Sequence, residues 1–335
     1  MILLILMIPT AASVFHQSHR FYNETEARQV FDLVAASYSQ HAEECVTARF
    51  PDSRVIKNIE LKCDVWFGSK CAAYVAVTES RRLMTIVFRG TTTTIQLFSE
   101  LSSFYFQYES FDDIGEINHY FKKGHEALWP AIHSILSDAA YEDYDVLFTG
   151  HSLGGALAVL AAARAIHRGL RDRHQVKVLT FAEPRVGNLK FARNFDRLVK
   201  YSFRIVNGAD AIVHAPPCHK DYSFLPSFNL PCDPTSVDGP YHHMTEVWYP
   251  NGMSQGSRYI VCDGSPRGEE HVCSNSLATT FANASKAIAD HRKYFNLMVS
   301  QYGRAGCNPK KDYDESQSFL IQIESVFKYL HKLFY

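Results

Sequence analysis

Residues 146–155 read Val-Leu-Phe-Thr-Gly-His-Ser-Leu-Gly-Gly, an apolar run that changes into the pattern Gly150-x-Ser152-x-Gly154. The apolar run has strand character, and alanine, leucine and valine recur at helical spacing over 156–166. A serine between a strand and a helix sits on a sharp turn, where neighbouring glycines let the two backbones pass closely. The pattern therefore predicts a strand, turn and helix that expose and orient the Ser152 hydroxyl.

A serine hydroxyl is a weak nucleophile near neutral pH, so it needs a histidine base and an acid that orients this base. In folds with this turn the chain order is serine, acid, histidine. Asp210 follows the apolar segment 203–206 and a glycine-containing loop, which is where the carboxyl end of a parallel strand presents an acid. His291 lies beyond the predicted strands, where a loop could bring it over the strand ends. His242 and His271 are the alternative bases, and Asp210 could instead cap an ordinary turn.

Six stretches of the chain, taken in order, resemble the class 3 family of fungal-type triacylglycerol lipases. The similarity runs from about Phe21 to Phe295, through 86–91, 150–155, 181–188, 207–210, 241–248 and 290–295. The resemblance implies an α/β-hydrolase fold, with a mainly parallel central sheet and helices on both faces. It also implies that Ser152 is the nucleophile, Asp210 the orienting acid and His291 the general base. Glu183 departs from the family, which commonly has glutamine or a threonine-like residue before the Pro-Arg pair.

The resemblance implies two further features near the serine. Thr91 and the backbone N–H of Leu153 would form the oxyanion hole, since an amide at a helix start favours developing negative charge. Thr91 opens a run of four threonines, so the register of this donor is open by one residue. A short lid helix follows in the resembling lipases, and a buried helix that never moves is the alternative. The predicted lid residues are Ile95, Leu97, Phe98 and Leu101.

The rest of the chain alternates between strand and helix patterns, which predicts one α/β domain over residues 14–310. An early hairpin is expected from 72–77 and 84–88, later strands at 176–181 and 203–206, and an antiparallel pair at 245–249 and 258–261. A crossover helix is expected at 189–198. Residues 311–335 form a C-terminal extension with the apolar stripe of an amphipathic helix, and they lie outside the resemblance.

The N-terminus and the cysteines indicate an oxidising compartment. Residues 1–13 are apolar and end in small residues, as in a secretory signal peptide, and they are too few for a bilayer span of about 20 residues. All eight cysteines follow this segment, and an even number in a secreted chain indicates disulfides, although it leaves the pairing open. Asn23 and Asn283 begin glycosylation acceptor motifs, and Asn23 or Thr25 could instead cap a helix. Local spacing and the resemblance together favour the pairs Cys63–Cys71, Cys262–Cys273, Cys218–Cys232 and Cys45–Cys307.

Charge and composition narrow the function. The 34 basic residues nearly balance the 35 acidic ones, so the chain has no nucleic-acid-binding signature. We therefore expect a secreted serine ester hydrolase that needs no cofactor or metal and acts on acylglycerols at a lipid–water interface, with its oligomeric state open. A phospholipase A1 or a feruloyl-type esterase on the same scaffold is the alternative. A catalytically silent lipid-binding protein is the remote one.

Overall fold

The computed structural model describes residues 21–63, 70–91, 107–221, 230–263, 267–277 and 284–310. The predicted signal peptide, the lid residues Ile95, Leu97, Phe98 and Leu101, the acceptor Asn283 and the extension 311–335 lie outside the described residues. These features remain predictions from the sequence.

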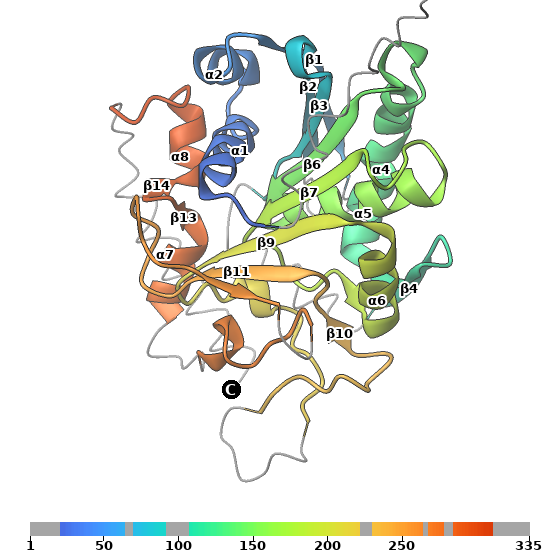
Figure 1. Ribbon diagram of the computed structural model, residues 1–335, viewed down its shortest axis with the longest axis vertical. Helices are drawn as coiled ribbons and strands as arrows, with labels where there is room; N and C mark the ends of the chain where they lie inside the picture. The colour runs from blue at the N-terminus through green and yellow to red at the C-terminus, as the bar shows by residue number, and fades with distance from the viewer. Residues whose placement is uncertain are drawn as a thin grey trace, which may run out of the picture.

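An eight-stranded sheet forms the centre of the fold, in the order β1-β2-β3-β6-β7-β9-β11-β12 (Figure 1). The five strands from β3 to β11 are parallel, while β1 and β2 at one edge and β12 at the other run antiparallel to their neighbours. This confirms the predicted mainly parallel sheet. The strands are β1 (Ser53–Lys62), β2 (Lys70–Thr78), β3 (Leu83–Phe88), β6 (Asp145–His151), β7 (Val176–Phe181), β9 (Tyr201–Asn207), β11 (Thr245–Tyr249) and β12 (Ile260–Cys262).

Helices cover both faces of this sheet, and a separate hydrophobic core lies between the sheet and the helices on each face. One face carries α4 (His119–Leu136), α5 (Leu153–His167) and α6 (Leu189–Leu198). The other carries α1 (Glu24–Ala36), α2 (Ala42–Arg49) and α8 (Val299–Arg304), seen on the left of Figure 1. The remaining named elements are α7 (Ala284–Arg292), the small sheet of β4 (Tyr108–Phe111), β5 (Gly115–Asn118), β8 (Gly187–Asn188) and β10 (Pro240–Tyr241), the hairpin of β13 (Lys293–Tyr294) and β14 (Leu297–Met298), and 3-10 turns at Glu79–Arg81, Ala139–Tyr141, Ile212–His214 and Ser274–Ser276.

Helix α5 is buried on all sides, which explains its composition. Every residue from Leu153 to Ala165 is buried, and six of the thirteen are alanines. Small side chains let the helix backbone lie close to the sheet on one side and to α4 on the other. The helix that carries the residue after Ser152 is therefore held rigidly in the core.

Most of the predicted elements appear where the sequence pattern places them. The hairpin of β2 and β3 is present, and α6 and β7 have the predicted bounds. The last antiparallel pair is also present, but β12 spans Ile260–Cys262 rather than the predicted 258–261. Asn23 caps α1, since its side-chain oxygen accepts a hydrogen bond from the Glu26 amide at 3.1 Å.

The described chain contains four disulfides, one between distant segments and three that close short loops, and their pairs are those expected from the sequence. Cys45–Cys307 joins α2 to the turn after α8 across 262 residues of sequence. Cys63–Cys71 links the ends of β1 and β2, Cys218–Cys232 closes a surface loop, and Cys262–Cys273 closes the loop after β12. The fold thus contains disulfide bonds, as the even number of cysteines indicated.

Candidate active site

The predicted site residues come together at the carboxyl ends of the parallel strands. Strands β3, β6, β7 and β9 all finish there, with Phe88 paired to Gly150 and Phe181 paired to both His151 and Ile205. The segments that continue from β3, β6 and β9 carry the predicted oxyanion donor, the serine and the acid. Loops at the carboxyl ends of parallel strands are the usual place for sites in this fold class.

Ser152 sits on a strained turn between β6 and α5. Its φ of 60° and ψ of −128° lie in a region that residues with a Cβ rarely adopt, and its amide donates to the Phe181 carbonyl at 2.9 Å. A Cβ on Gly150 would overlap the backbone of Gly154, and one on Gly154 would overlap the carbonyl of Phe88. Both glycines are therefore required by close backbone contact, as the pattern predicts.

The three predicted residues form a continuous chain of hydrogen bonds. Ser152 Oγ lies 3.0 Å from Nε2 of His291, and Nδ1 of His291 lies 3.0 and 3.1 Å from the two carboxylate oxygens of Asp210. All three side chains are almost fully buried, with exposed fractions of 2%, 3% and 0% for Ser152, His291 and Asp210. In the described part of the chain neither His242 nor His271 has a hydrogen bond to Ser152. The imidazole of His242 instead faces the Val213 carbonyl at 2.7 Å.

His291 lies in the last turn of helix α7, and this helix, rather than a loop, brings it over the strand ends. The end of α7 is fixed to the loop after β9 by several polar contacts. Asp290 accepts a hydrogen bond from the Ala209 amide at 2.8 Å, and the Asn207 side chain donates to the carbonyls of Asp290 and Lys293 at 3.2 and 2.7 Å. Between them Gly208 has a φ of +52°, and a Cβ there would collide with the Asp290 carboxylate. The segment Asn-Gly-Ala-Asp is therefore the docking site for the helix that supplies the histidine.

Two further donors hold the carboxylate of Asp210. The Ile212 amide donates to Oδ1 at 3.0 Å, and the Tyr294 hydroxyl donates to Oδ2 at 2.8 Å. Burial alone would raise the pKa of Asp210, but nearby His291 and the hydrogen bonds from His291 and Tyr294 outweigh it. The pKa of Asp210 is therefore below its ordinary value, and the group stays ionised. Tyr294 was not among the predicted site residues, although it lies only three positions after His291.

The predicted oxyanion donors lie next to the serine. Leu153 is the first residue of α5, so its amide has no acceptor within the helix and is free for an oxyanion. Gly90 packs against the turn, with its ideal Cβ position 3.3 Å from Ser152 Cβ, and Thr91 follows it. Thr91 lines a cavity of about 30 Å³ together with His151 and His291. Residues 92–94 lie outside the described residues, so the register within the threonine run stays a prediction.

Glu183, the residue that departs from the resembling family, lies against two polar side chains in the core. It is 1% exposed, and its carboxylate oxygens lie 2.8 Å from Nε2 of His243 and 2.6 Å from the hydroxyl of Thr180. Its Cβ and Cγ lie within about 3.3 Å of the ideal Cβ position at Gly155, in the first turn of α5. A carboxylate fits this site because a histidine faces it inside the core.

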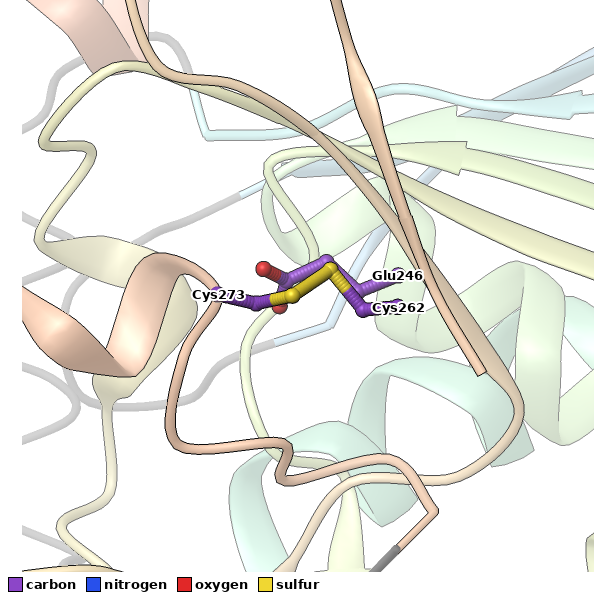
Figure 2. A group of neighbouring side chains, drawn as sticks. All are labelled: Glu246, Cys262 and Cys273. Atoms are coloured by element: carbon purple, nitrogen blue, oxygen red, sulfur yellow. A yellow bond between two sulfur atoms is a disulfide. The ribbon is translucent and has the colours of Figure 1, made fainter. Parts of the chain in front are cut away.

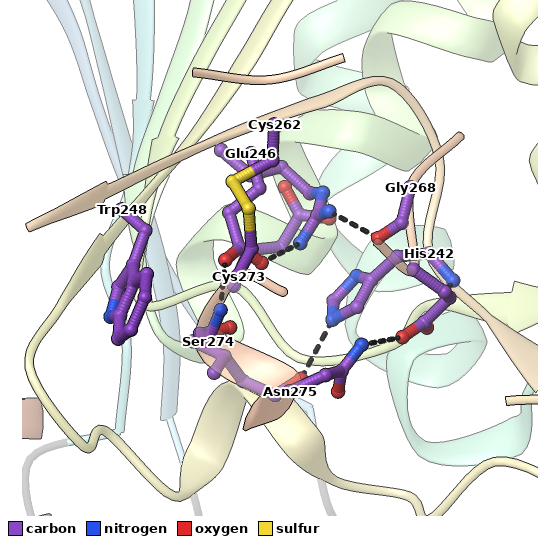
Figure 3. A network of polar contacts seen from close by, with 12 residues as sticks. His242, Glu246, Trp248, Cys262, Gly268, Cys273, Ser274 and Asn275 are labelled. Carbon is purple, nitrogen blue, oxygen red and sulfur yellow. Dashed lines mark hydrogen bonds and ion pairs between the residues drawn. A yellow bond between two sulfur atoms is a disulfide. The ribbon is translucent and has the colours of Figure 1, made fainter. Parts of the chain in front are cut away.

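A second buried network supports the loop that follows Asp210. Arg185 forms a two-pronged ion pair with Glu269, at 2.6 and 2.9 Å, and donates to the carbonyls of His214 and Pro216. Glu269 also accepts from the His242 amide at 2.9 Å and from Asn275 at 2.7 Å. Burial opposes ionisation of Glu269, yet Arg185 overrides it and lowers the pKa of this carboxyl well below its usual range. His242, Gly268 and Asn275 are labelled in the view of this region in Figure 3.

One group of described residues has the composition of a metal site but not its chemistry. The carboxylate of Glu246 lies beside the sulfurs of Cys262 and Cys273 (Figure 2). These sulfurs are bonded to each other as a disulfide, so neither is a thiolate that could bind a metal. Glu246 accepts a hydrogen bond from the Ser274 amide at 3.0 Å (Figure 3). Among the described helices, none is long and apolar enough to cross a membrane.

Comparison with known proteins identifies relatives of this chain. The family model for lipase (class 3) matches residues 85–220. Lipase ZK262.3 of Caenorhabditis elegans is 42% identical over 315 residues, which cover 92% of this chain and 89% of the relative. Secreted mono- and diacylglycerol lipase 1 of Fusarium solani is 25% identical and covers 67% of this chain and 65% of the relative.

A solved structure shares the fold. It is that of a triacylglycerol lipase whose catalytic centre is formed by a serine protease triad. It superposes with a TM-score of 0.64 at 24% identity, covering 83% of this chain and 96% of the other. The chain has the serine turn and the sheet of this fold, and the Caenorhabditis elegans lipase matches it over almost the whole length of both proteins. This chain therefore belongs to the class 3 lipase family and is a carboxylic ester hydrolase of the α/β-hydrolase fold.

Proposed function

We propose that this protein is a secreted lipase that cleaves acylglycerol esters, with Ser152 as nucleophile, His291 as general base and Asp210 as orienting acid. The observation that carries the proposal is the buried chain of hydrogen bonds from Ser152 Oγ through the His291 imidazole to the Asp210 carboxylate. The three groups have the chain order and the contacts that acyl transfer by a serine requires. The triad of the structurally similar triacylglycerol lipase supports the proposal.

The first half of the reaction forms an acyl-enzyme. Ser152 Oγ attacks the ester carbonyl carbon while Nε2 of His291 takes the hydroxyl proton, and the carbonyl oxygen becomes an oxyanion. The Leu153 amide and Thr91 stabilise this charge. The tetrahedral intermediate then collapses, His291 returns the proton to the departing alkoxide, and an alcohol such as a diacylglycerol leaves.

The second half releases the acid. Water attacks the acyl-Ser152 ester while His291 takes one of its protons, and collapse of the second intermediate gives the free carboxylic acid and restores Ser152. Asp210 accepts a hydrogen bond from the Nδ1–H group of His291 throughout. It thereby fixes the tautomer with a free Nε2 and stabilises the imidazolium that forms in each half.

The lipid preference is proposed to depend on residues 95–101. A lid with one apolar face would cover the acyl site when closed and lie against lipid when open. Phe98→Ser and Leu101→Ser should then reduce hydrolysis of emulsified triacylglycerol and spare a soluble short-chain ester. Equal losses on both substrates would instead indicate a fixed core segment.

Secretion is proposed from the N-terminal segment together with the four disulfides. Removal of the signal peptide would leave a mature chain that begins near residue 13 or 14. N-terminal sequencing of protein recovered from the medium of expressing cells tests this. An intact Met1 on a chain that stays inside the cell would contradict secretion.

A hydrolysis panel tests the proposed activity. Wild-type protein, Ser152→Ala and His291→Ala are assayed on triacylglycerol, phosphatidylcholine and a short aryl ester. Ser202→Ala is the matched control. Ser202 is also 2% exposed, but it lies near the start of β9, at the opposite end of this strand from Asp210. We expect the two site variants to lose several powers of ten in kcat and the control to keep wild-type activity. Full activity in Ser152→Ala would refute the proposal, and faster turnover of phosphatidylcholine than of triacylglycerol would favour a phospholipase A1.

A further inference from the structure

His151, between Gly150 and the nucleophile, has two polar contacts that the proposed reaction does not use. Its Nδ1 lies 3.0 Å from the hydroxyl of Tyr38, and its Nε2 lies 2.8 Å from the backbone carbonyl oxygen of His291. A carbonyl oxygen can only accept a hydrogen bond, so Nε2 of His151 carries the proton and donates it. Nδ1 is therefore the acceptor for the Tyr38 hydroxyl. One neutral tautomer of His151 satisfies both contacts.

The charge state of His151 agrees with this tautomer. Its ring centroid lies 4.8 Å from that of His291, so two imidazolium groups there would repel each other. Burial first, and then the proximity of His291, lower the pKa of His151 to about 3, against the smaller opposing effect of Asp210. His151 therefore stays neutral while His291 gains and loses its proton. The Tyr38 hydroxyl remains protonated, because burial raises its pKa.

Tyr38 connects this pair to the oxyanion segment. It follows the end of α1 and is buried, and its hydroxyl occupies the space that a Cβ on Gly90 would need. Gly90 precedes Thr91, and Thr91, Tyr38, His151 and His291 line the same cavity of about 30 Å³. The end of α1, the oxyanion segment, the serine turn and the helix of the base thus meet at the Tyr38–His151 pair.

We infer that Tyr38 and His151 are positioning residues for His291, a role that rests on the proposed triad. The hydrogen bond from His151 fixes the backbone carbonyl of His291 and so sets the distance between its imidazole and Ser152 Oγ. Tyr38 fixes the His151 ring in turn, since its donated hydrogen bond selects the tautomer that can reach this carbonyl. Displacement of a reacting group by about 1 Å can reduce a rate about 100-fold, so this anchoring affects turnover rather than substrate binding.

The test compares three variants on a soluble short-chain ester. His151→Leu removes both hydrogen bonds, and His151→Gln restores a donor near the position of Nε2. Tyr38→Phe removes only the hydroxyl. We expect kcat to fall about 10- to 100-fold in His151→Leu with KM nearly unchanged, to recover most of this loss in His151→Gln, and to fall severalfold in Tyr38→Phe. The rate of Ser152 labelling by a fluorophosphonate should fall by the same factors as kcat.

Two controls separate the possible failures. Tyr302→Phe removes a buried tyrosine hydroxyl that donates to Asp32 at 2.8 Å, and it should lower thermal stability without changing kcat. Wild-type kcat in folded His151→Leu, or in Tyr38→Phe if His151→Leu does not fold, would overturn the inference and leave His151 as a packing residue. Retained activity in Ser152→Ala would instead refute the proposed triad, on which the inference depends.

Discussion

Tyr294→Phe removes one hydroxyl from the acid side of the site and keeps the ring in place. The hydroxyl donates to Asp210 at 2.8 Å, and both side chains are 0% exposed, so water does not replace the lost contact. Hydrogen bonds to charged groups contribute about 1.5 to 3 kcal/mol, and we expect the free energy of unfolding to fall by about this amount. The His291 imidazole and the Ile212 amide still hold the carboxylate. The fall in kcat should therefore be only severalfold, far smaller than that of Asp210→Ala.

The same substitution should move the pH dependence of activity. Because the Tyr294 hydrogen bond helps to lower the pKa of Asp210, its loss raises that pKa, and activity should fail at a higher pH on the acid side. Chemical denaturation and a pH series of kcat/KM measure the two effects. Tyr302→Phe is the matched control, with similar destabilisation through Asp32 and no change in the pH profile. An unchanged stability and pH profile in Tyr294→Phe would refute the argument, as would an equal loss of kcat in Tyr302→Phe.

Three further predictions concern stability and modification. The pKa values of three buried histidines and of the half-buried His214 lie below their ordinary value because burial disfavours their charged form, so the unfolded chain binds more protons than the folded one below about pH 6.5. Stability should be fully present above that pH and fall as the pH decreases toward 4, by up to about 1.4 kcal/mol per pH unit for each of His125, His151, His214 and His242, and a flat denaturation profile would contradict this. Replacing both Cys45 and Cys307 by serine should cost about 5.6 kcal/mol in the chain-entropy treatment, against about 2.5 kcal/mol for Cys63 and Cys71, because the first bridge spans 262 residues and the second 8. Asn23 is exposed and caps α1 through its oxygen, which leaves its amide nitrogen for a glycan, so protein secreted from eukaryotic cells should lose mass at Asn23 after glycosidase treatment, and an unmodified Asn23 peptide would contradict this.

The serine turn and the strand and helix that flank it could be predicted because most of their causes are local. Gly150 is needed because its backbone packs against that of Gly154, four positions along the chain, and the apolar runs on both sides define β6 and α5. The contact that requires Gly154 is with Phe88 in β3 and depends on the fold. Asp210 could be predicted because parallel strands all end on the same side of the sheet. The residues that follow such a strand therefore lie on the side that carries the serine. The bounds of helix α6 could also be predicted, because its hydrophobic periodicity is contained within ten consecutive residues.

The supporting residues could not be predicted because their partners are distant. Tyr294 and Asp210 are 84 residues apart, and His151 and the His291 carbonyl are 140 apart. No local pattern indicates either contact. His291 itself was recognised, but its place in the last turn of α7 depends on Asp290 and Asn207 holding that turn to the β9 loop. Glu183 had no explanation from sequence, because its partner His243 lies 60 positions away and only the fold brings the two together.

Covalent labelling of Ser152 tests the central claim most directly. Folded wild-type protein and His291→Ala are treated with a fluorophosphonate, digested and mapped by mass spectrometry. A serine with a working base reacts because its proton is removed as the bond to phosphorus forms. We predict a single phosphonylated peptide carrying the adduct on Ser152 in the wild type, formed several powers of ten more slowly in His291→Ala. An adduct on another serine, or equal labelling rates in the two proteins, would contradict the assignment of Ser152 and His291 as nucleophile and base.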